Sequence, residues 1–239
     1  MAQPTVSYPD GKRIAVCISA MLEVWSPGKA PSYAVQTTSL KPGRVDYGGI
    51  AWAQYGPNVG VWRIIRALDN FKIRGTFGVS AMCTELYPEV IAQIVKSGHD
   101  IAGHGFWQDK LLPDMTVEEQ HSMIRRCQEM LEKATGRRPN GWMTPSLAWT
   151  PETVEFLAQE GIDWYGDARD FDLPRRVVTK HGSLIAVPLS EFTDNRVLRS
   201  SPRDFHEVYK DTFDYLYKHE PISLLHMVLH CHWGGRPLM

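Results

Sequence analysis

The sequence is short of the features that mark several large classes of protein. Its 26 Lys and Arg residues nearly balance its 27 Asp and Glu residues, which leaves a formal net charge of −1. A chain without a basic excess has no bulk attraction to nucleic acid or to anionic membranes, so we expect neither as a partner. No apolar run approaches the roughly 18 residues of a membrane span, and Met1–Tyr8 lacks the basic flank and apolar core of a signal peptide. We therefore expect a cytoplasmic protein.

Paired cysteines and several familiar motifs are also lacking. Cys17, Cys83, Cys127 and Cys231 are scattered without a C-x-x-C pair, a pattern typical of reduced core thiols. The chain has no G-x-x-x-x-G-K-[ST], no G-x-G-x-x-G after its first strand, no G-x-S-x-G and no H-E-x-x-H. These absences exclude the sites for nucleotide phosphates, dinucleotides, serine hydrolysis and zincin-type zinc that are most easily recognised. Acid/base or metal-assisted chemistry by Glu, Asp and His remains.

Apolar patterning alternates between strands and helices along the chain. Strand composition is found at residues 14–22, 75–80, 101–103, 142–144, 162–167, 183–188 and 222–232. Helical periodicity is found at residues 58–71, 86–96, 117–135, 150–160 and 204–218, with Asn58 as the expected cap of the first. This order predicts an α/β protein, a single domain over residues 1–239 built as a distorted (β/α) barrel of about seven strands. The last strand of such a barrel is normally followed by a further helix, so a C-terminal segment could be missing from this sequence.

Ionisable side chains follow the predicted strands. Glu23 comes directly after the first strand, and His104 lies between two glycines at the end of the third. Strand alternation places His226, His230 and His232 on one face of the last strand. Because parallel strands present their C-terminal ends at one rim, these groups predict a shared pocket or a metal site there. The alternatives are a solvated loop glutamate and a histidine that only caps a strand.

A long loop rich in Gly, Pro, Ser, Tyr and Trp is predicted over residues 26–57, and loops of this length are usually functional. It would form a lid or a wall of the pocket. The candidate substrate-binding residues are aromatic or polar groups in this loop or near strand ends: Trp25, Tyr47, Trp52, Trp107, Gln108, Trp142, Asp167, Glu191 and Arg236. The tryptophans suit a planar ring, although any one of them could instead pack in the core.

Several motifs taken together resemble the polysaccharide deacetylase superfamily, also called the chitooligosaccharide deacetylase-like or carbohydrate esterase family four fold. They are Gly75–Val79, Gly98–Gly105 and Leu229–His230. Further segments are most similar to the branch of metal-independent allantoinases and cyclic imide hydrolases: Ala51–Gly56, Gly60–Arg63, Arg138–Trp142, Phe171–Pro174, Leu229–Cys231 and Gly235–Pro237. The resemblance covers most of the chain, from Ile14 to Pro237.

The sequence departs from the deacetylase pattern at the metal ligands. The deacetylases hold a divalent metal, usually zinc, with one Asp and an H-x-x-x-H pair. Here Ser19-Ala20 stands where the Asp pair belongs, and Gln108 follows His104 at the position of the second His. An amide oxygen is a weak ligand, so a deacetylase-type zinc site is not expected. Glu23 stands where the allantoinase branch carries a Glu, which favours that branch and implies no cofactor.

The resemblance implies hydrolysis of a small cyclic or linear amide or imide, such as allantoin, a hydantoin or a cyclic imide, by acid/base activation of water. We expect Glu23, His104 and His230 to be catalytic, with Arg236 and backbone N–H groups stabilising the oxyanion. One alternative is a metal-dependent N-deacetylase of an amino sugar or polysaccharide, with zinc on His104, His226 and His230. Another is a non-catalytic protein that binds a metabolite or sugar. The resemblance also implies a homo-oligomer, possibly a tetramer.

Overall fold

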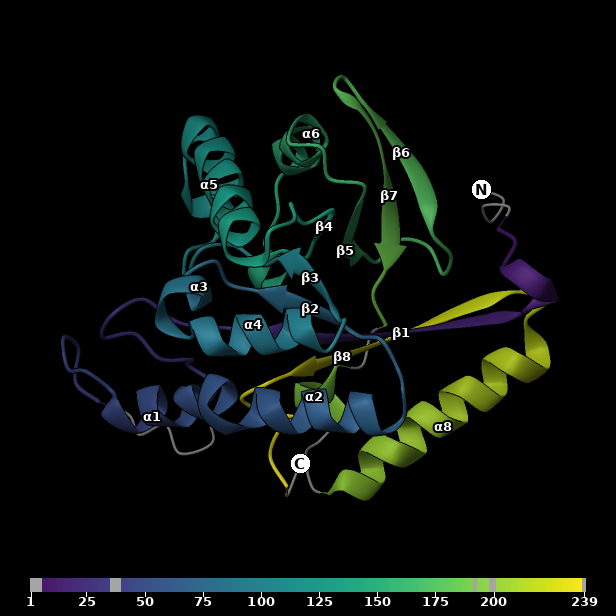
Figure 1. Ribbon diagram of the computed structural model, residues 1–239, viewed down its shortest axis with the longest axis horizontal. Helices are drawn as coiled ribbons and strands as arrows, with labels where there is room; N and C mark the ends of the chain where they lie inside the picture. The colour runs from purple at the N-terminus through teal and green to yellow at the C-terminus, as the bar shows by residue number, and fades with distance from the viewer. Residues whose placement is uncertain (1–5, 35–39, 191–192, 198–200, 238–239) are drawn as a thin grey trace.

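The fold is built on one mixed sheet. The computed structural model describes residues 6–34, 40–190, 193–197 and 201–237. Eight strands lie in the order β6-β7-β5-β4-β3-β2-β1-β8. All neighbouring strands from β7 to β8 run parallel, and β6 pairs antiparallel with β7 (Figure 1). The sheet curls into a half-barrel, which confirms the predicted distorted barrel.

The strands are short except at the two ends of the chain. In order they are β1 (Ile14–Leu22), β2 (Thr76–Val79), β3 (Asp100–Gly103), β4 (Gly141–Trp142), β5 (Trp164–Ala168), β6 (Arg175–Thr179), β7 (Gly182–Pro188) and β8 (Ser223–His230). β1 and β8, from opposite ends of the sequence, pair over their whole length from Ile14–Ser223 to Met21–His230. This pairing brings the C-terminal ends of the first and last strands to one rim.

Helices cover the outer side of the sheet. The helices are α1 (Tyr47–Tyr55), α2 (Val61–Asn70), α3 (Cys83–Leu86), α4 (Pro88–Lys96), α5 (Val117–Thr135), α6 (Pro151–Gln159), α7 (Asp194–Val197) and α8 (Pro202–His219). Short helical segments are η1 (Pro9–Gly11), η2 (Gly56–Gly60), η3 (Leu112–Asp114) and η4 (Pro145–Leu147). Figure 1 shows α2, α4, α5 and α6 following one another along the sheet, with α8 beside β1 and β8.

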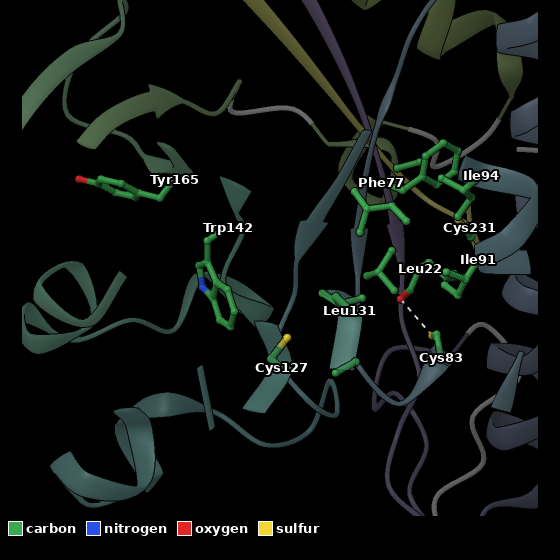
Figure 2. Packing of buried hydrophobic residues seen from close by; sticks show 14 of the residues in the cluster. Leu22, Phe77, Cys83, Ile91, Ile94, Cys127, Leu131, Trp142, Tyr165 and Cys231 are labelled. Atoms are coloured by element: carbon green, nitrogen blue, oxygen red, sulfur yellow. Dashed lines mark hydrogen bonds between the residues drawn. The ribbon is translucent and has the colours of Figure 1, made fainter. Parts of the chain in front are cut away.

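The main hydrophobic core lies between the sheet and these helices. Phe77, Leu22 and Trp142 are among its fully buried side chains, and Ile91 and Leu131 meet them from α4 and α5 (Figure 2). Burying side chains of this size stabilises the fold by about 1.5–3 kcal/mol each. Met21, Met143 and Val228 form a second, separate cluster of buried hydrophobic side chains.

Helix α5 shows how the local sequence sets the bounds of an element. Thr116 accepts a hydrogen bond from the Glu119 N–H, and the Glu119 carboxylate accepts one from the Thr116 N–H. Gly136 ends the helix in the left-handed conformation at φ 74°. Both signals are the ones expected of a capping box and a C-terminal glycine, and the predicted helix over 117–135 is confirmed.

The predicted loop over residues 26–57 contains helix α1, so this part of the prediction is wrong. Asp46 caps α1 by accepting from the Gly49 N–H at 2.8 Å. The chain then continues through the π-helical η2 into α2, and Asn58 lies inside this run instead of capping it. Two glycines at the start of α1 hid its helical character, because glycine is a poor helix former.

Strand β6 was also missed. It forms a hairpin with β7 whose register runs from Arg175–Ala186 to Thr179–Gly182. Two arginines at its start and its exposed Val178 do not give the apolar run of a buried parallel strand, because β6 is an edge strand with one open side. In the part of the chain that the structure describes, no helix has the length and apolar character needed to cross a membrane.

A close backbone contact holds η2 against the turn that follows β8. A Cβ atom on Gly60 would lie 1.9 Å from the Cys231 carbonyl oxygen, and one on Gly56 would lie 2.9 Å from the His232 amide nitrogen. No side chain fits at such distances, and the obstacle is backbone that cannot rotate away. The two glycines therefore let the helix approach the turn that carries His232.

We predict that Gly60→Ala lowers the free energy of unfolding by about 3 kcal/mol or more, because the added methyl overpacks this contact. The matched control is Gly48→Ala in α1, where the new methyl would meet only Asp46 Oδ1 at 3.4 Å. The control should be neutral or gain up to about 1 kcal/mol. Urea unfolding followed by circular dichroism measures both, and equal stability of the two variants would contradict the contact described.

Candidate active site

A buried glutamate lies at the centre of the candidate site. Glu23 follows β1 at the rim and is 2% exposed. Its Oε1 lies 3.2 Å from His104 Nε2 and 3.8 Å from His230 Nε2. Its Oε2 lies 3.5 Å from His232 Nδ1. A carboxylate without water must be compensated by nearby positive charge or hydrogen bonds, and here three imidazoles surround it.

His104 is fixed by a backbone carbonyl. Its Nδ1 lies 2.7 Å from the Met143 carbonyl oxygen, which can only accept, so Nδ1 carries a proton. Its Nε2 lies 3.2 Å from Glu23 Oε1, within hydrogen-bond distance. Gly103 and Gly105 make room on either side: a Cβ on Gly103 would meet the Trp142 ring at 2.6 Å, and Gly105 has φ 64°. Backbone geometry thus places this imidazole at the end of β3.

His230 is held by a carboxylate. Asp194, fully buried at the start of α7, accepts from His230 Nδ1 at 2.6 Å and from the His230 amide at 2.6 Å. It also accepts from the Gly234 amide at 2.9 Å. Asp194, His230 and Glu23 form a chain in which an imidazole lies between two carboxylates. Such an arrangement fixes the ring and stabilises its protonated form.

The surroundings of Glu23, His230 and His232 shift the pKa values of these three groups in different ways. Burial raises the pKa of the Glu23 carboxyl, but the charge of His230 and the hydrogen bond from His104 outweigh this and lower it to about 2. Burial lowers the pKa of His230, yet Asp194 and Glu23 raise it to about 9. For His232, burial dominates and lowers the pKa to about 4. At neutral pH the site therefore holds an ionised Glu23 beside a protonated His230.

His232 packs in an aromatic wall. Its ring meets Trp25 and Trp52 edge-on, with centroids 5.2 and 5.1 Å away. Its Nε2 lies 3.3 Å from the Tyr33 hydroxyl. Burial, followed by the charge of Glu23, raises the Tyr33 pKa, so its hydroxyl stays protonated and can donate to His232. This wall closes one side of Glu23.

A cavity of about 170 Å³ opens onto Glu23, His104 and His230. Gln108 lines it with a buried side-chain Oε1 that has no hydrogen-bond partner, while its backbone N–H donates to the Val24 carbonyl at 2.8 Å. Ser146 also lines it, in the left-handed conformation at φ 55°. An unpaired buried acceptor and a strained residue are both costly, and both are typical of a functional site.

Asp167 forms another part of the cavity wall. Both of its oxygens accept from Thr144, at 2.9 and 3.1 Å from the amide and 2.5 Å from Oγ1. Trp142 Nε1 in turn donates to Thr144 Oγ1 at 3.1 Å. Burial raises the pKa of Asp167 to about 6 against these hydrogen bonds. The Asp167 carboxyl thus changes charge in the neutral to mildly acidic range.

The structure distributes the other predicted residues over three places. Trp25 and Trp107 line a second cavity that also reaches Glu23, and Trp52 stands in the aromatic wall. Tyr47 is 77% exposed at the start of α1. Glu191 lies outside the described residues.

Trp142 and Arg236, both predicted to contact the substrate, pack against other parts of the protein instead. Trp142 is fully buried in the main core, because the two-residue β4 turns its ring toward the helices, and this corrects its prediction as a pocket residue. Arg236 stacks over Trp52 and Tyr55, and it donates to the His232 carbonyl at 2.9 Å and the Trp52 carbonyl at 2.8 Å. Its role here is to tie the aromatic wall to α1, which does not support an oxyanion contact.

The zinc set His104, His226 and His230 is not brought together. His226 faces the inside of the barrel, but both ring nitrogens are engaged, with Ser19 Oγ at 2.8 Å and the Pro188 carbonyl at 3.1 Å. It lies four residues before His230, about 13 Å along an extended strand. Within the described residues, no group of three or more His, Cys, Asp or Glu side chains has the arrangement of a metal site. The donors present thus do not fit the zinc of the alternative prediction.

Three contributors to the site were not assigned a role from the sequence: Asp194, His232 and Tyr33. Asp194 follows the sixth predicted strand, so its position near the rim was visible, but its pairing with His230 was not. His232 was placed on the face of the last strand, whereas β8 ends at His230 and His232 lies in the following turn. Tyr33 comes from a loop whose fold no periodicity reveals.

Comparisons with known proteins found similar sequences and structures. The family model described as "Polysaccharide deacetylase" matches residues 54–165. The peptidoglycan deacetylase of Helicobacter pylori is 21% identical over 86% of this chain and 84% of its own length. The PuuE allantoinase structure superposes with a TM-score of 0.84 and 25% identity over 97% of this chain and 82% of its own. A Pseudomonas aeruginosa PAO1 structure described as a probable polysaccharide deacetylase has a TM-score of 0.85 and 24% identity over the same shares.

The His230–Asp194 pair predicts a specific pH dependence. If protonated His230 is required, activity should fall as pH rises through about 9, the pKa that Asp194 and Glu23 maintain. Asp194→Asn removes a negative charge and lowers the His230 pKa, so the alkaline limb of kcat/KM should move to lower pH. Asp214→Asn, on the exposed face of α8, is the control. An unchanged limb in Asp194→Asn with native circular dichroism would contradict this role of the pair.

Proposed function

The chain carries a domain of the polysaccharide deacetylase family, and from this premise we propose that it hydrolyses a C–N bond of a small cyclic or linear amide or imide. Its relatives are hydrolases that act on carbon–nitrogen bonds other than peptide bonds. The observation that carries the proposal is the buried Glu23 carboxylate between His104 and His230, with Asp194 behind His230. This arrangement supplies both a base and an acid at one cavity.

We assign the base to Glu23. It is ionised at neutral pH and lines the cavity, so it can accept a proton from a water molecule that attacks the amide carbon. The low pKa makes it a weak base by itself, and the hydrogen bond with His104 Nε2 positions the carboxylate. Because both ring nitrogens of His104 are engaged, backbone N–H groups at the rim are the donors available to the developing oxyanion.

We assign the acid to His230. Its Nε2 proton points toward Glu23 and the cavity, and Asp194 keeps the ring protonated at neutral pH. As the tetrahedral intermediate collapses, Nε2 gives its proton to the leaving nitrogen and the C–N bond breaks. The proton that Glu23 took from water then passes to His230 over the 3.8 Å between them, which restores both groups. The net reaction consumes one water for each bond broken.

A second candidate function is N-deacetylation of an amino sugar, favoured by the similarity to the Helicobacter pylori peptidoglycan deacetylase. That reaction is hydrolysis of an amide as well, so the same acid and base would serve. The cavity of about 170 Å³ is small for a polymer, which favours the small amide.

The test is a hydrolysis screen over allantoin, hydantoin, succinimide, glutarimide and N-acetylglucosamine oligomers, each with and without EDTA. We expect turnover of at least one small cyclic substrate that EDTA does not remove, because the donors described do not fit a zinc site. Turnover only of the sugar oligomers would support the second candidate instead, and its loss in EDTA with restoration by zinc would contradict the metal-free acid and base. Turnover of no substrate would contradict both.

Substitution of the acid and base should then lower the rate of the substrate found. We predict that Glu23→Gln, His104→Ala and His230→Ala each reduce kcat by roughly 10²–10⁴-fold, the typical contribution of a general acid or base. Glu129→Gln on α5 and His181→Gln in the β6–β7 hairpin are exposed controls and should leave kcat unchanged. Wild-type kcat in all three site variants would rule out the assignment.

A further inference from the structure

We propose that the cavity beside Trp25 and Trp107 binds an aryl or branched alkyl arm of the substrate, while the scissile amide lies at Glu23. This inference rests on the proposed function and names a class of substrate for it: cyclic or linear amides that carry one apolar substituent, such as a 5-benzylhydantoin. The cavity has a volume of about 220 Å³ and is separate from the one lined by His104 and His230. We call it the aromatic chamber.

The walls of the aromatic chamber are mainly apolar. Its lining side chains come from the segment after β1, from α1 and η2, from the end of α3 and from the loop after β3: Val24, Trp25, Pro27, Ile50, Ala53, Pro57, Leu86, Tyr87 and Trp107. Its polar lining residues include Lys29 and Gln54, both exposed. Sites for small molecules have this composition, an apolar lining with few polar groups. A cavity of about 150 Å³ can hold a benzene ring, so the chamber is large enough for one.

The chamber is joined to the candidate active site at Glu23. Glu23 is common to the linings of both cavities, and a single bound molecule can therefore reach into both. Trp25 links them as well, because its ring contacts that of His232, whose Nδ1 lies 3.5 Å from Glu23 Oε2. A group in the chamber would thus lie beside the side chains that surround the proposed base.

Hydrogen bonds between two segments hold the walls of the aromatic chamber in position. Asp109 accepts from the Ser26 amide at 2.7 Å and from Ser26 Oγ at 2.5 Å, which ties the segment after β1 to the loop after β3. The backbone N–H of Gln108 donates to the Val24 carbonyl at 2.8 Å and joins the same two segments. These bonds hold Trp25 and Trp107, which come from the two tied segments, in position before a ligand arrives. A preformed apolar site loses little ordering entropy on binding.

A probe that carries the arm without the amide tests the chamber apart from catalysis. We expect 4-fluorotoluene to bind the wild-type protein, observed as a shift or broadening of its ¹⁹F resonance. Gln54→Phe places a ring from α1 into the chamber and should abolish binding, whereas the matched Ala51→Phe, on an exposed position of the same helix, should not. Absence of binding to the wild type, or equal binding to both variants, would overturn the inference.

Kinetics test whether the arm is part of the substrate. We expect kcat/KM for 5-benzylhydantoin to exceed that for hydantoin by at least about tenfold, as burial of a ring predicts. Gln54→Phe should remove this preference, and Ala51→Phe should preserve it. Equal kcat/KM for the two hydantoins would overturn the inference. Binding of 4-fluorotoluene that only Gln54→Phe abolishes, without turnover of any amide, would instead uphold the chamber while the proposed function fails.

Discussion

The burial of one carboxylate organises this protein. Glu23 is 2% exposed at the end of a strand whose last residues are buried, and an isolated charge in that position would cost several kcal/mol. Four other ionisable groups, His104, His230, His232 and Asp194, are arranged so that this charge persists. Removing one partner would leave a buried charge uncompensated, which ties the stability of the rim to the same side chains that the proposed chemistry uses.

The sheet brings these groups together from distant parts of the sequence. Parallel pairing of β1 with β2 and β8, and of β2 with β3, places the three strand ends at one rim, so Glu23, His104 and His230 meet although they lie up to 207 residues apart (230 − 23). Glycine residues then allow neighbouring segments to approach closely around these groups. Gly103 admits the Trp142 ring behind His104, and Gly60 admits the Cys231 carbonyl beside His232. The positions of the imidazoles thus depend on residues with no side chain.

The sequence predicted those elements that are marked by neighbouring residues in the chain. A run of apolar residues marks β1, glycines mark the end of β3, and both place Glu23 and His104 without knowledge of the fold. The side that a residue faces was harder to predict when its strand is short: β4 has only two residues, too few for alternation to show that Trp142 points to the helices. The residue pairs Asp194–His230 and Tyr33–His232 join a loop or short helix to β8 or the turn after it, and no spacing in one sequence records such contacts. The hydrogen bonds between Ser26 and Asp109 could not be predicted from the sequence for the same reason.

The Met21, Met143 and Val228 cluster has a consequence for how the inside of the barrel titrates. It lies between Ser19–His226 and the rim, so His226 and His230, four residues apart on one strand, have opposite surroundings: burial lowers the pKa of His226, while Asp194 and Glu23 raise that of His230. These methyl and thioether groups carry no exchangeable proton, so the layer offers no proton relay between the rim and His226. Protons can therefore move among the groups at the rim without passing through this layer to the histidine beneath it.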